Sequence, residues 1–165
     1  MKDISKAYSK GNKIWAGVFA VLTFLLLCFI WGQSMLPREA SAAESSRWML
    51  VLKPLLDPGN QISDDTFHHY LRKAAHFSEY AALGFCMSGF LMNLQWKRTR
   101  ARIPTIVACC VLTAAIDESI QLFSEGRGAQ ISDVLLDACG ALFGLAVFLL
   151  LFFALRRKKL PNATS

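Results

Sequence analysis

The sequence lacks the motifs that mark several common classes of enzyme and metalloprotein. It has no glycine-rich phosphate loop, and no serine, histidine and aspartate in the order of a hydrolase triad. Its five cysteines are an odd number, and their spacing fits neither a disulfide framework nor a zinc site. We interpret them as small apolar residues packed between helices: Cys28, Cys86, Cys109, Cys110 and Cys139.

The sequence also lacks the mixed polar and apolar pattern of a soluble domain of its size. Of its 165 residues, 54% are hydrophobic, and they gather in long blocks that so small a soluble core could not bury. The net charge of +6 arises from short basic clusters beside these blocks. Such clusters fit anionic lipid headgroups, so we expect a lipid bilayer as partner and no nucleic acid.

Four apolar blocks predict four membrane spans, because about 20 helical residues cross a bilayer. The expected fold is all-α, a four-transmembrane-helix bundle in one domain over residues 1–165, with spans at about 14–31, 73–95, 103–123 and 133–155. A shorter apolar stretch, Trp48 to Leu56, predicts an interfacial or re-entrant helix in the first extracytoplasmic loop. A cleaved signal peptide is the alternative for the first block, but the cleavage-like Ala40-Ser41-Ala42 lies well beyond it, which favours an uncleaved anchor.

The lysines and arginines beside the spans set the expected orientation. The N-terminal tail, the loop after the second span and the C-terminal tail carry four each, whereas the loop after the third span carries only Arg127. The positive-inside rule therefore places both termini in the cytoplasm.

Ionisable residues inside a span are costly, so each needs a partner, a wet cavity or a function. The last three spans carry polar residues near their outer ends: Lys73, His76, Glu79, Tyr80, Asp117, Glu118, Gln121, Asp133 and Asp137. Arg127 lies in the short connection above them. Because the second and fourth spans enter from outside and the third ends there, we expect these residues to converge on one site. Gly140 and Gly144 continue the stripe of Asp133 and Asp137, which predicts close helix packing below the acids.

Two interpretations of this polar cluster stay open. Its charges could only hold the bundle together, with Arg127 paired to Asp133 or Glu118, and Lys73 or His76 paired to Glu79. The number of acids favours a binding or catalytic cavity instead. As an enzyme site, it would use carboxylates for acid–base work and Arg127 to hold an anion. As a metal site, it would bind Mg²⁺ or Ca²⁺, with His76 as a further ligand. As a proton relay in a carrier, it would require a homo-oligomer.

Each residue of the cluster has an expected role. The candidate catalytic residues are Asp117, Glu118, Glu79 and His76. The candidate substrate-binding residues are Lys73, Tyr80, Gln121, Arg127, Asp133 and Asp137. A divalent cation is the one candidate cofactor.

Several short motifs follow one another along the chain: Gly32-Gln33-Ser34, Lys73-x-x-His76-Phe77-x-Glu79-Tyr80-x-x-Leu83-Gly84, Asp117-Glu118-x-x-Gln121, Arg127, Asp133 and the Gly140/Gly144 stripe. In this order and spacing, over residues 31 to about 145, the sequence resembles the VanZ-like family of bacterial membrane proteins. One position departs from the family pattern, because Asp137 stands where the family often carries Asn.

The resemblance implies a multi-pass protein of the bacterial cytoplasmic (inner) membrane that acts at the cell envelope. The family's namesake gives low-level resistance to the lipoglycopeptide teicoplanin. We therefore expect the outward-facing polar site to bind or modify an envelope lipid, a lipid-linked molecule or a lipoglycopeptide. The alternatives are a non-enzymatic accessory or structural protein and a small ion- or proton-coupled carrier. The resemblance leaves open whether the protein is an enzyme.

Overall fold

The computed structural model describes residues 13–94, 101–126, 128 and 130–157. This part of the chain is all-helical, which confirms the expected all-α class. Its five helices are α2 (Lys13–Ser34), α3 (Arg38–Leu56), α4 (Asp64–Asn93), α5 (Arg102–Leu122) and α6 (Ile131–Arg157).

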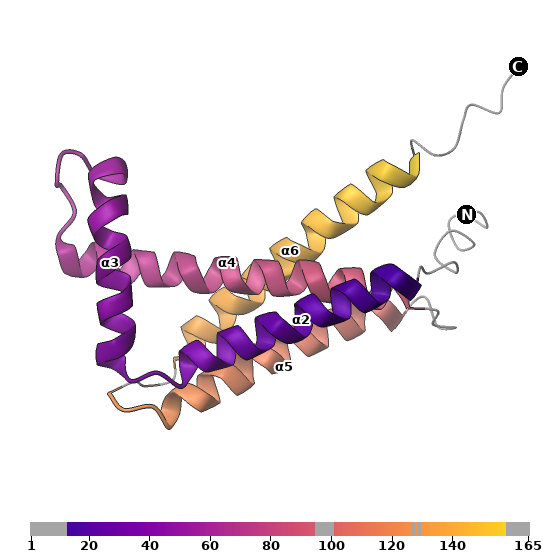
Figure 1. The fold of residues 1–165 in the computed structure, drawn as a ribbon, viewed down its shortest axis with the longest axis horizontal. Coiled ribbons are helices and arrows are strands. Elements are labelled where there is room, and N and C mark those ends of the chain that lie inside the picture. Colours follow the sequence, from indigo (N-terminus) through magenta and orange to yellow (C-terminus); the bar gives the residue numbers. More distant parts are fainter. Residues whose placement is uncertain (1–12, 95–100, 127, 129, 158–165) are drawn as a thin grey trace, which may run out of the picture.

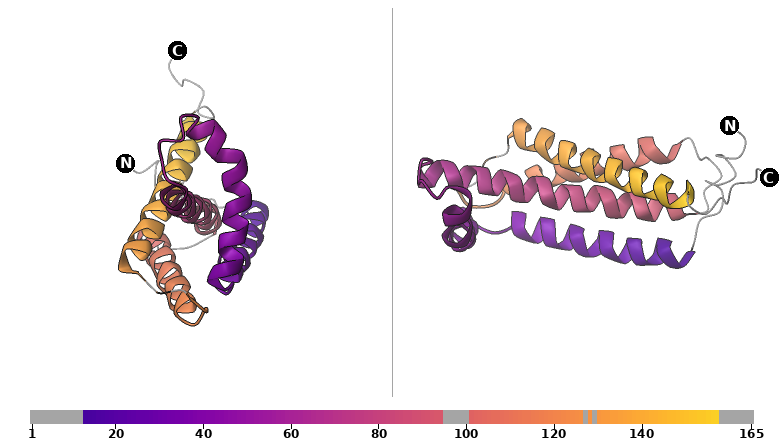
Figure 2. Two further views of the ribbon diagram at one scale, coloured as in Figure 1. Left: turned by 90° about the vertical axis from the view of Figure 1, so that its left-hand side faces the viewer. Right: turned by 90° about the horizontal axis from the view of Figure 1, so that it is seen from above.

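The four longest helices form an elongated bundle, and α3 crosses one end of it (Figure 1). α2 and α5 begin, and α4 and α6 end, at the other end of the bundle (Figure 2). The most extensive packing is between α4 and α6, followed by α2 and α4. This arrangement brings the end of α2, the start of α4, the end of α5 and the start of α6 together near α3.

Three helices are long and apolar enough to cross a membrane: α2, α5, and α6 from Ile131 to Leu155. They match the first, third and fourth predicted spans within a few residues. The predicted second span falls in α4, apart from Leu94, which caps the helix, and residue 95, which lies outside the described residues. With 30 residues, α4 is about 45 Å long at the helical rise, but its first half is rich in charged residues. Because of these charges, α4 is not one of the three apolar helices.

The predicted interfacial segment is the second half of α3. The helix begins ten residues earlier than the apolar stretch, at Arg38, and runs through it to Leu56. None of its residues is buried, and Trp48, Leu50 and Leu55 are more than half exposed. An exposed apolar face on a helix that lies across the bundle end is typical of helices at a membrane interface.

The turn between α3 and α4 is held by Asp57. Its carboxylate accepts hydrogen bonds from the backbone N–H groups of Gln61 and Ile62, both at 2.9 Å. The bonds from Ile62 and Gln61 lower the pKa of Asp57 from its ordinary value of 3.8. Ser63 then caps α4 by accepting from the Thr66 N–H, so the helix begins where a capping residue is expected.

Glycines allow α4 and α6 to approach until their backbones touch. A Cβ atom at Gly144 would collide with the Ala81 carbonyl, and one at Gly140 with the Phe77 carbonyl. On α4, a Cβ at Gly84 would collide with Ala141 in the same way. The predicted close packing along the glycine stripe is confirmed.

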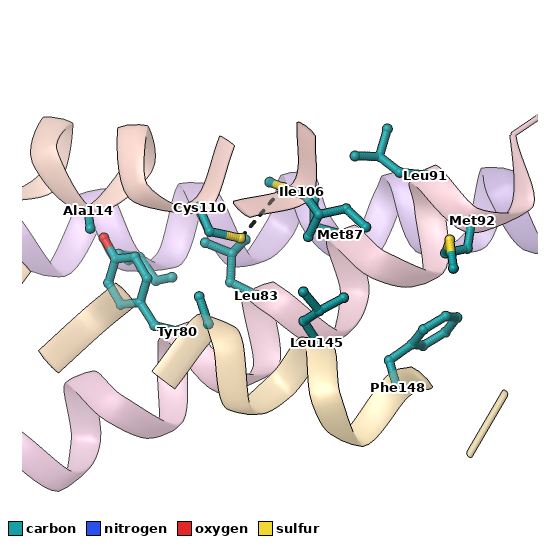
Figure 3. Close-up of a cluster of buried hydrophobic side chains, with 12 residues drawn as sticks. Tyr80, Leu83, Met87, Leu91, Met92, Ile106, Cys110, Ala114, Leu145 and Phe148 are labelled. Carbon is teal, nitrogen blue, oxygen red and sulfur yellow. Dashed lines mark hydrogen bonds between the residues drawn. The ribbon is translucent and has the colours of Figure 1, made fainter. Parts of the chain in front are cut away.

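The apolar core lies directly below the polar end of the bundle. Figure 3 shows α4, α5 and α6 contributing side chains to it, including Leu83, Ile106 and Leu145. The Cys110 thiol contacts the Met87 sulfur at 3.8 Å in this core (Figure 3). All five cysteines have free thiols. Cys110 is buried, and Cys86 and Cys109 are partly buried, but Cys28 and Cys139 are exposed, so the expected packing between helices is wrong for these two.

Candidate functional site

Asp117 is the centre of the polar cluster. It lies near the end of α5 with no exposed surface. It accepts hydrogen bonds from Ser34 Oγ at 2.6 Å and from Gln121 Nε2 at 3.1 Å. Ser124 Oγ in turn donates to the Ser34 carbonyl at 2.7 Å. The last residue of α2 is therefore tied to the end of α5.

Ser34 is a site residue that the prediction of polar positions missed. That prediction considered the last three spans only, and Ser34 ends the first. The signal that could have found it is the Gly32-Gln33-Ser34 motif, which places a small polar residue at the outer end of α2.

His76 and Asp137 face each other between α4 and α6. His76 Nδ1 lies 3.7 Å from Asp137 Oδ1, and Asp137 has no exposed surface. One ligand atom each of His76, Asp117 and Asp137 lie within 4.8 Å of one another. Neither carboxylate oxygen of Asp137 has a hydrogen-bond partner among the residues that the structure describes. These three residues form the inner part of the cluster.

Lys73 and Asp133 form a second layer, one helical turn closer to the bundle end. Their Nζ–Oδ1 distance is 2.9 Å, and both side chains are partly exposed. Sequence reasoning had considered Glu79 as the partner of Lys73 or His76, and Arg127 as that of Asp133. Lys73 pairs with Asp133 instead, and His76 faces Asp137, because these side chains lie on the contacting faces of α4 and α6.

The remaining predicted residues lie around this core. Glu118 is buried and accepts the Gln130 backbone N–H at 2.9 Å, which fixes the chain just before α6. Tyr80 is buried and extends from α4 toward α5 (Figure 3). Glu79 lines a cleft together with His76. Arg127, the expected anion clamp, lies outside the described residues.

A cleft of about 610 Å³ opens between α2, α3 and α4. This volume is within the range of small-molecule sites. Ser34, His76 and Glu79 contribute polar groups to its wall, and Trp48 and Leu52 of α3 contribute apolar ones. Ser34 and His76 belong to both the cleft and the cluster, so the cleft lies beside the buried carboxylates of Asp117 and Asp137, neither of which lines it.

An all-helical chain with three apolar helices long enough to span a bilayer is a membrane protein. Its buried carboxylate–imidazole cluster, in contact with a cleft at one end, is typical of a membrane protein with a functional polar site. The chain belongs to the VanZ/LLP1 family, whose model matches residues 19–153. The match confirms the VanZ-like resemblance and spans every residue of the predicted site. No curated protein and no solved structure shows a significant match to the chain.

Proposed function

We propose that this protein binds or modifies an envelope lipid or lipid-linked molecule at the cleft between α2, α3 and α4. Through this activity it would contribute to low-level tolerance of lipoglycopeptides such as teicoplanin. The observation that carries the proposal is the composition of the cleft wall. Polar groups of Ser34, His76 and Glu79 share one cavity with the apolar side chains of Trp48 and Leu52. A lipid offers the same combination, a polar headgroup joined to an apolar chain.

The proposal includes a four-span topology in a single domain, with α4 as the second span. It is supported by the position of α4, which runs lengthwise between the other long helices (Figure 2). The second half of α4 is largely buried, and its polar first half packs against α3 and α6. The polar residues of α4 therefore have protein partners and need not face lipid.

The proposal also places the cleft on the outer side of the bacterial cytoplasmic membrane. The support is the distribution of lysine and arginine, since the basic flanks adjoin the opposite end of the bundle. At the outer face, the cleft would meet lipids and lipid-linked precursors that reside in that leaflet. Antibiotics that act on the envelope would meet the same surface.

The proposed roles follow from the positions of the residues. His76 and Glu79 border the cleft and are the groups best placed for acid–base chemistry, with Asp117 behind Ser34. Lys73, which is paired with Asp133, and Arg127, which precedes α6 in the sequence, are the expected sources of positive charge for an anionic headgroup. The contact of Glu118 with Gln130 supports a positioning role for this acid.

Single replacements in cells test the proposal. We expect His76→Ala, Glu79→Gln and Asp117→Asn to abolish tolerance while the protein remains at normal abundance in the membrane. Asp65→Asn, at an exposed acid in the first turn of α4, is the matched control and should keep tolerance. Loss of the protein itself in all three variants would favour the interpretation that these residues only hold the bundle together.

Lipid analysis distinguishes the enzyme from the alternative of a non-enzymatic accessory. Mass spectrometry of lipids and cell-wall precursors should reveal a modified species when the wild-type protein is overproduced, but not with His76→Ala. Unchanged profiles together with retained tolerance would favour the accessory. Reporter fusions at residues 60 and 98 test the topology. A reporter that works only outside the cytoplasm should be active at residue 60 and inactive at residue 98, and a reporter that works only in the cytoplasm should give the reverse.

A further inference from the structure

Two carboxylates and one imidazole meet in the interior of the bundle. Asp117 of α5 and Asp137 of α6 have no exposed surface, and His76 of α4 is only partly exposed. Their ligand atoms lie within 4.8 Å of one another. Each of three helices therefore brings one potential metal ligand to the same point.

A cation would stabilise the two carboxylates of this group, of which only Asp117 accepts hydrogen bonds, from Ser34 and Gln121, among the described residues. Two buried carboxylates so close together repel each other, and burial removes the water that would otherwise stabilise them. Lys73 lies one helical turn from His76 on α4, but its ammonium group binds Asp133 in the outer layer. A single protonated imidazole would balance only one of the two negative charges.

Two buried polar groups at this point, Asp137 and the Tyr80 hydroxyl, are a second observation that favours a bound ligand, apart from the number of acids. Neither carboxylate oxygen of Asp137 forms a hydrogen bond with any described residue, and the Tyr80 hydroxyl forms none either. Asp137 and Tyr80 are both completely buried. The Tyr80 hydroxyl extends from α4 toward Ala114 of α5, one turn before Asp117 on the same helix (Figure 3). Leaving such groups buried without hydrogen-bond partners is unfavourable, because they lose their bonds to water and gain none in return.

We propose that His76, Asp117 and Asp137 bind one divalent transition-metal cation, Zn²⁺ or Mn²⁺. The His76–Asp137 separation of 3.7 Å falls in the spacing of about 3–4 Å expected for two ligands about 2.1 Å from one ion. Mixed nitrogen and oxygen donors suit Zn²⁺ or Mn²⁺, whereas Ca²⁺ takes oxygen ligands. The bound cation neutralises both carboxylates. With the cation bound, His76 and Asp117 serve as its ligands, and Glu79 remains as the acid–base group that borders the cleft. The inference does not depend on whether the cleft acts on a lipid.

Metal binding by the purified full chain in detergent tests the site. After treatment with a chelator, the protein is loaded with Zn²⁺ or Mn²⁺, passed through a desalting column and analysed for bound metal. We expect one equivalent per chain. Substitution of residues that only support a ligand weakens metal binding by about 10- to 100-fold, so we expect Asp137→Asn and His76→Ala to weaken it by at least about 100-fold.

Matched controls separate this site from weak binding elsewhere. Asp65→Asn removes an exposed acid and His69→Ala an exposed imidazole, both on α4, and both variants should bind like wild type. Wild-type protein without a stoichiometric metal overturns the proposal, as does equal binding by Asp137→Asn.

Thermal unfolding of the wild-type protein tests the proposal even if a variant fails to fold. Zn²⁺ or Mn²⁺ should raise the melting temperature of chelator-treated wild-type protein, and Ca²⁺ should not, because a ligand stabilises the state that binds it. No metal-dependent shift in wild type overturns the proposal without reference to any variant. Loss of the shift in Asp137→Asn, with the shift kept in Asp65→Asn, supports it.

Discussion

Ser34, the last residue of α2, donates a 2.6 Å hydrogen bond to Asp117 of α5, although 83 positions separate them in the sequence. Both residues are buried. This bond joins the first helix to the carboxylate at the centre of the polar cluster. It also brings the cleft, which Ser34 lines, to within one side chain of that carboxylate.

Ser34→Ala should lower the free energy of unfolding and remove one hydrogen bond from Asp117. Hydrogen bonds between membrane helices contribute about 1–2 kcal/mol, and the substitution leaves Asp117 with one donor fewer. The free energy of unfolding in detergent, measured by SDS titration, should fall by about this amount. Ser78→Ala is the control, because Ser78 is exposed and donates only to a carbonyl of its own helix. Equal stability of the two variants would contradict the role of Ser34.

The ion pair between Lys73 and Asp133 should give a small but measurable coupling. Both side chains are partly exposed, so we expect a coupling energy of about 0.5–1 kcal/mol in a double-mutant cycle with Lys73→Met and Asp133→Asn. The coupling should decrease at high salt. A cycle that pairs Asp133→Asn with Lys53→Met, whose partner is Asp64, should show none.

Gly144→Ala should be more disruptive than its size suggests. The added methyl group meets the Ala81 carbonyl, and backbone cannot move aside as a flexible side chain can. Overpacking of this kind costs about 1–3 kcal/mol. Gly17→Ala, on α2 with open space around its Cβ position, should leave the melting temperature unchanged or raise it slightly. Similar melting temperatures for the two variants would show that α4 and α6 are less closely packed.

Arg102 should be essential at the opposite end of the bundle. It is fully buried, and its guanidinium donates to the carbonyls of Met92 at 3.1 Å and Leu94 at 3.0 Å. These carbonyls belong to the end of α4, where no helical N–H remains to bind them. Arg102→Met leaves them buried without this donor and should lower the unfolding free energy by about 2–4 kcal/mol. The exposed Arg47→Met is the control and should change it by less than about 0.5 kcal/mol.

Acid should open the turn between α3 and α4. Because backbone N–H groups lower the pKa of Asp57 below 3.8, its stabilising effect is complete above that pH and is lost as the pH falls through the lowered value. Hydrogen-exchange protection of the Gln61 and Ile62 amides should therefore decrease below about pH 3.8. In Asp57→Ala, protection should be low at every pH. Protection in wild type that does not depend on pH would contradict this role.

Much of the fold was predictable because apolar blocks and their flanks are local signals. The first, third and fourth blocks became α2, α5 and α6. Gly140 and Gly144 predicted the helix contact because small residues have few other uses in such a stripe.

The partners within the site could not be predicted, since they depend on how each helix is rotated about its axis. Lys73 had several acids within reach, and only the packing of α4 on α6 selects Asp133. Ser34 acquires its role from Asp117, which no pattern near Ser34 indicates. The length of α3 was underestimated because its first half is polar, so that no apolar block marks it.

The direct backbone contact of α4 with α6 makes the two sides of the cleft mechanically unequal. Glycine packing locks α4, which carries His76 and Glu79, to its neighbour as one rigid unit. α3, which carries Trp48 and Leu52, buries none of its residues and can shift at little cost. A molecule in the cleft would thus meet an unyielding surface at its polar end and an adaptable one along its apolar part. We expect selection to be strict for the headgroup and permissive for the length and branching of the hydrocarbon chain.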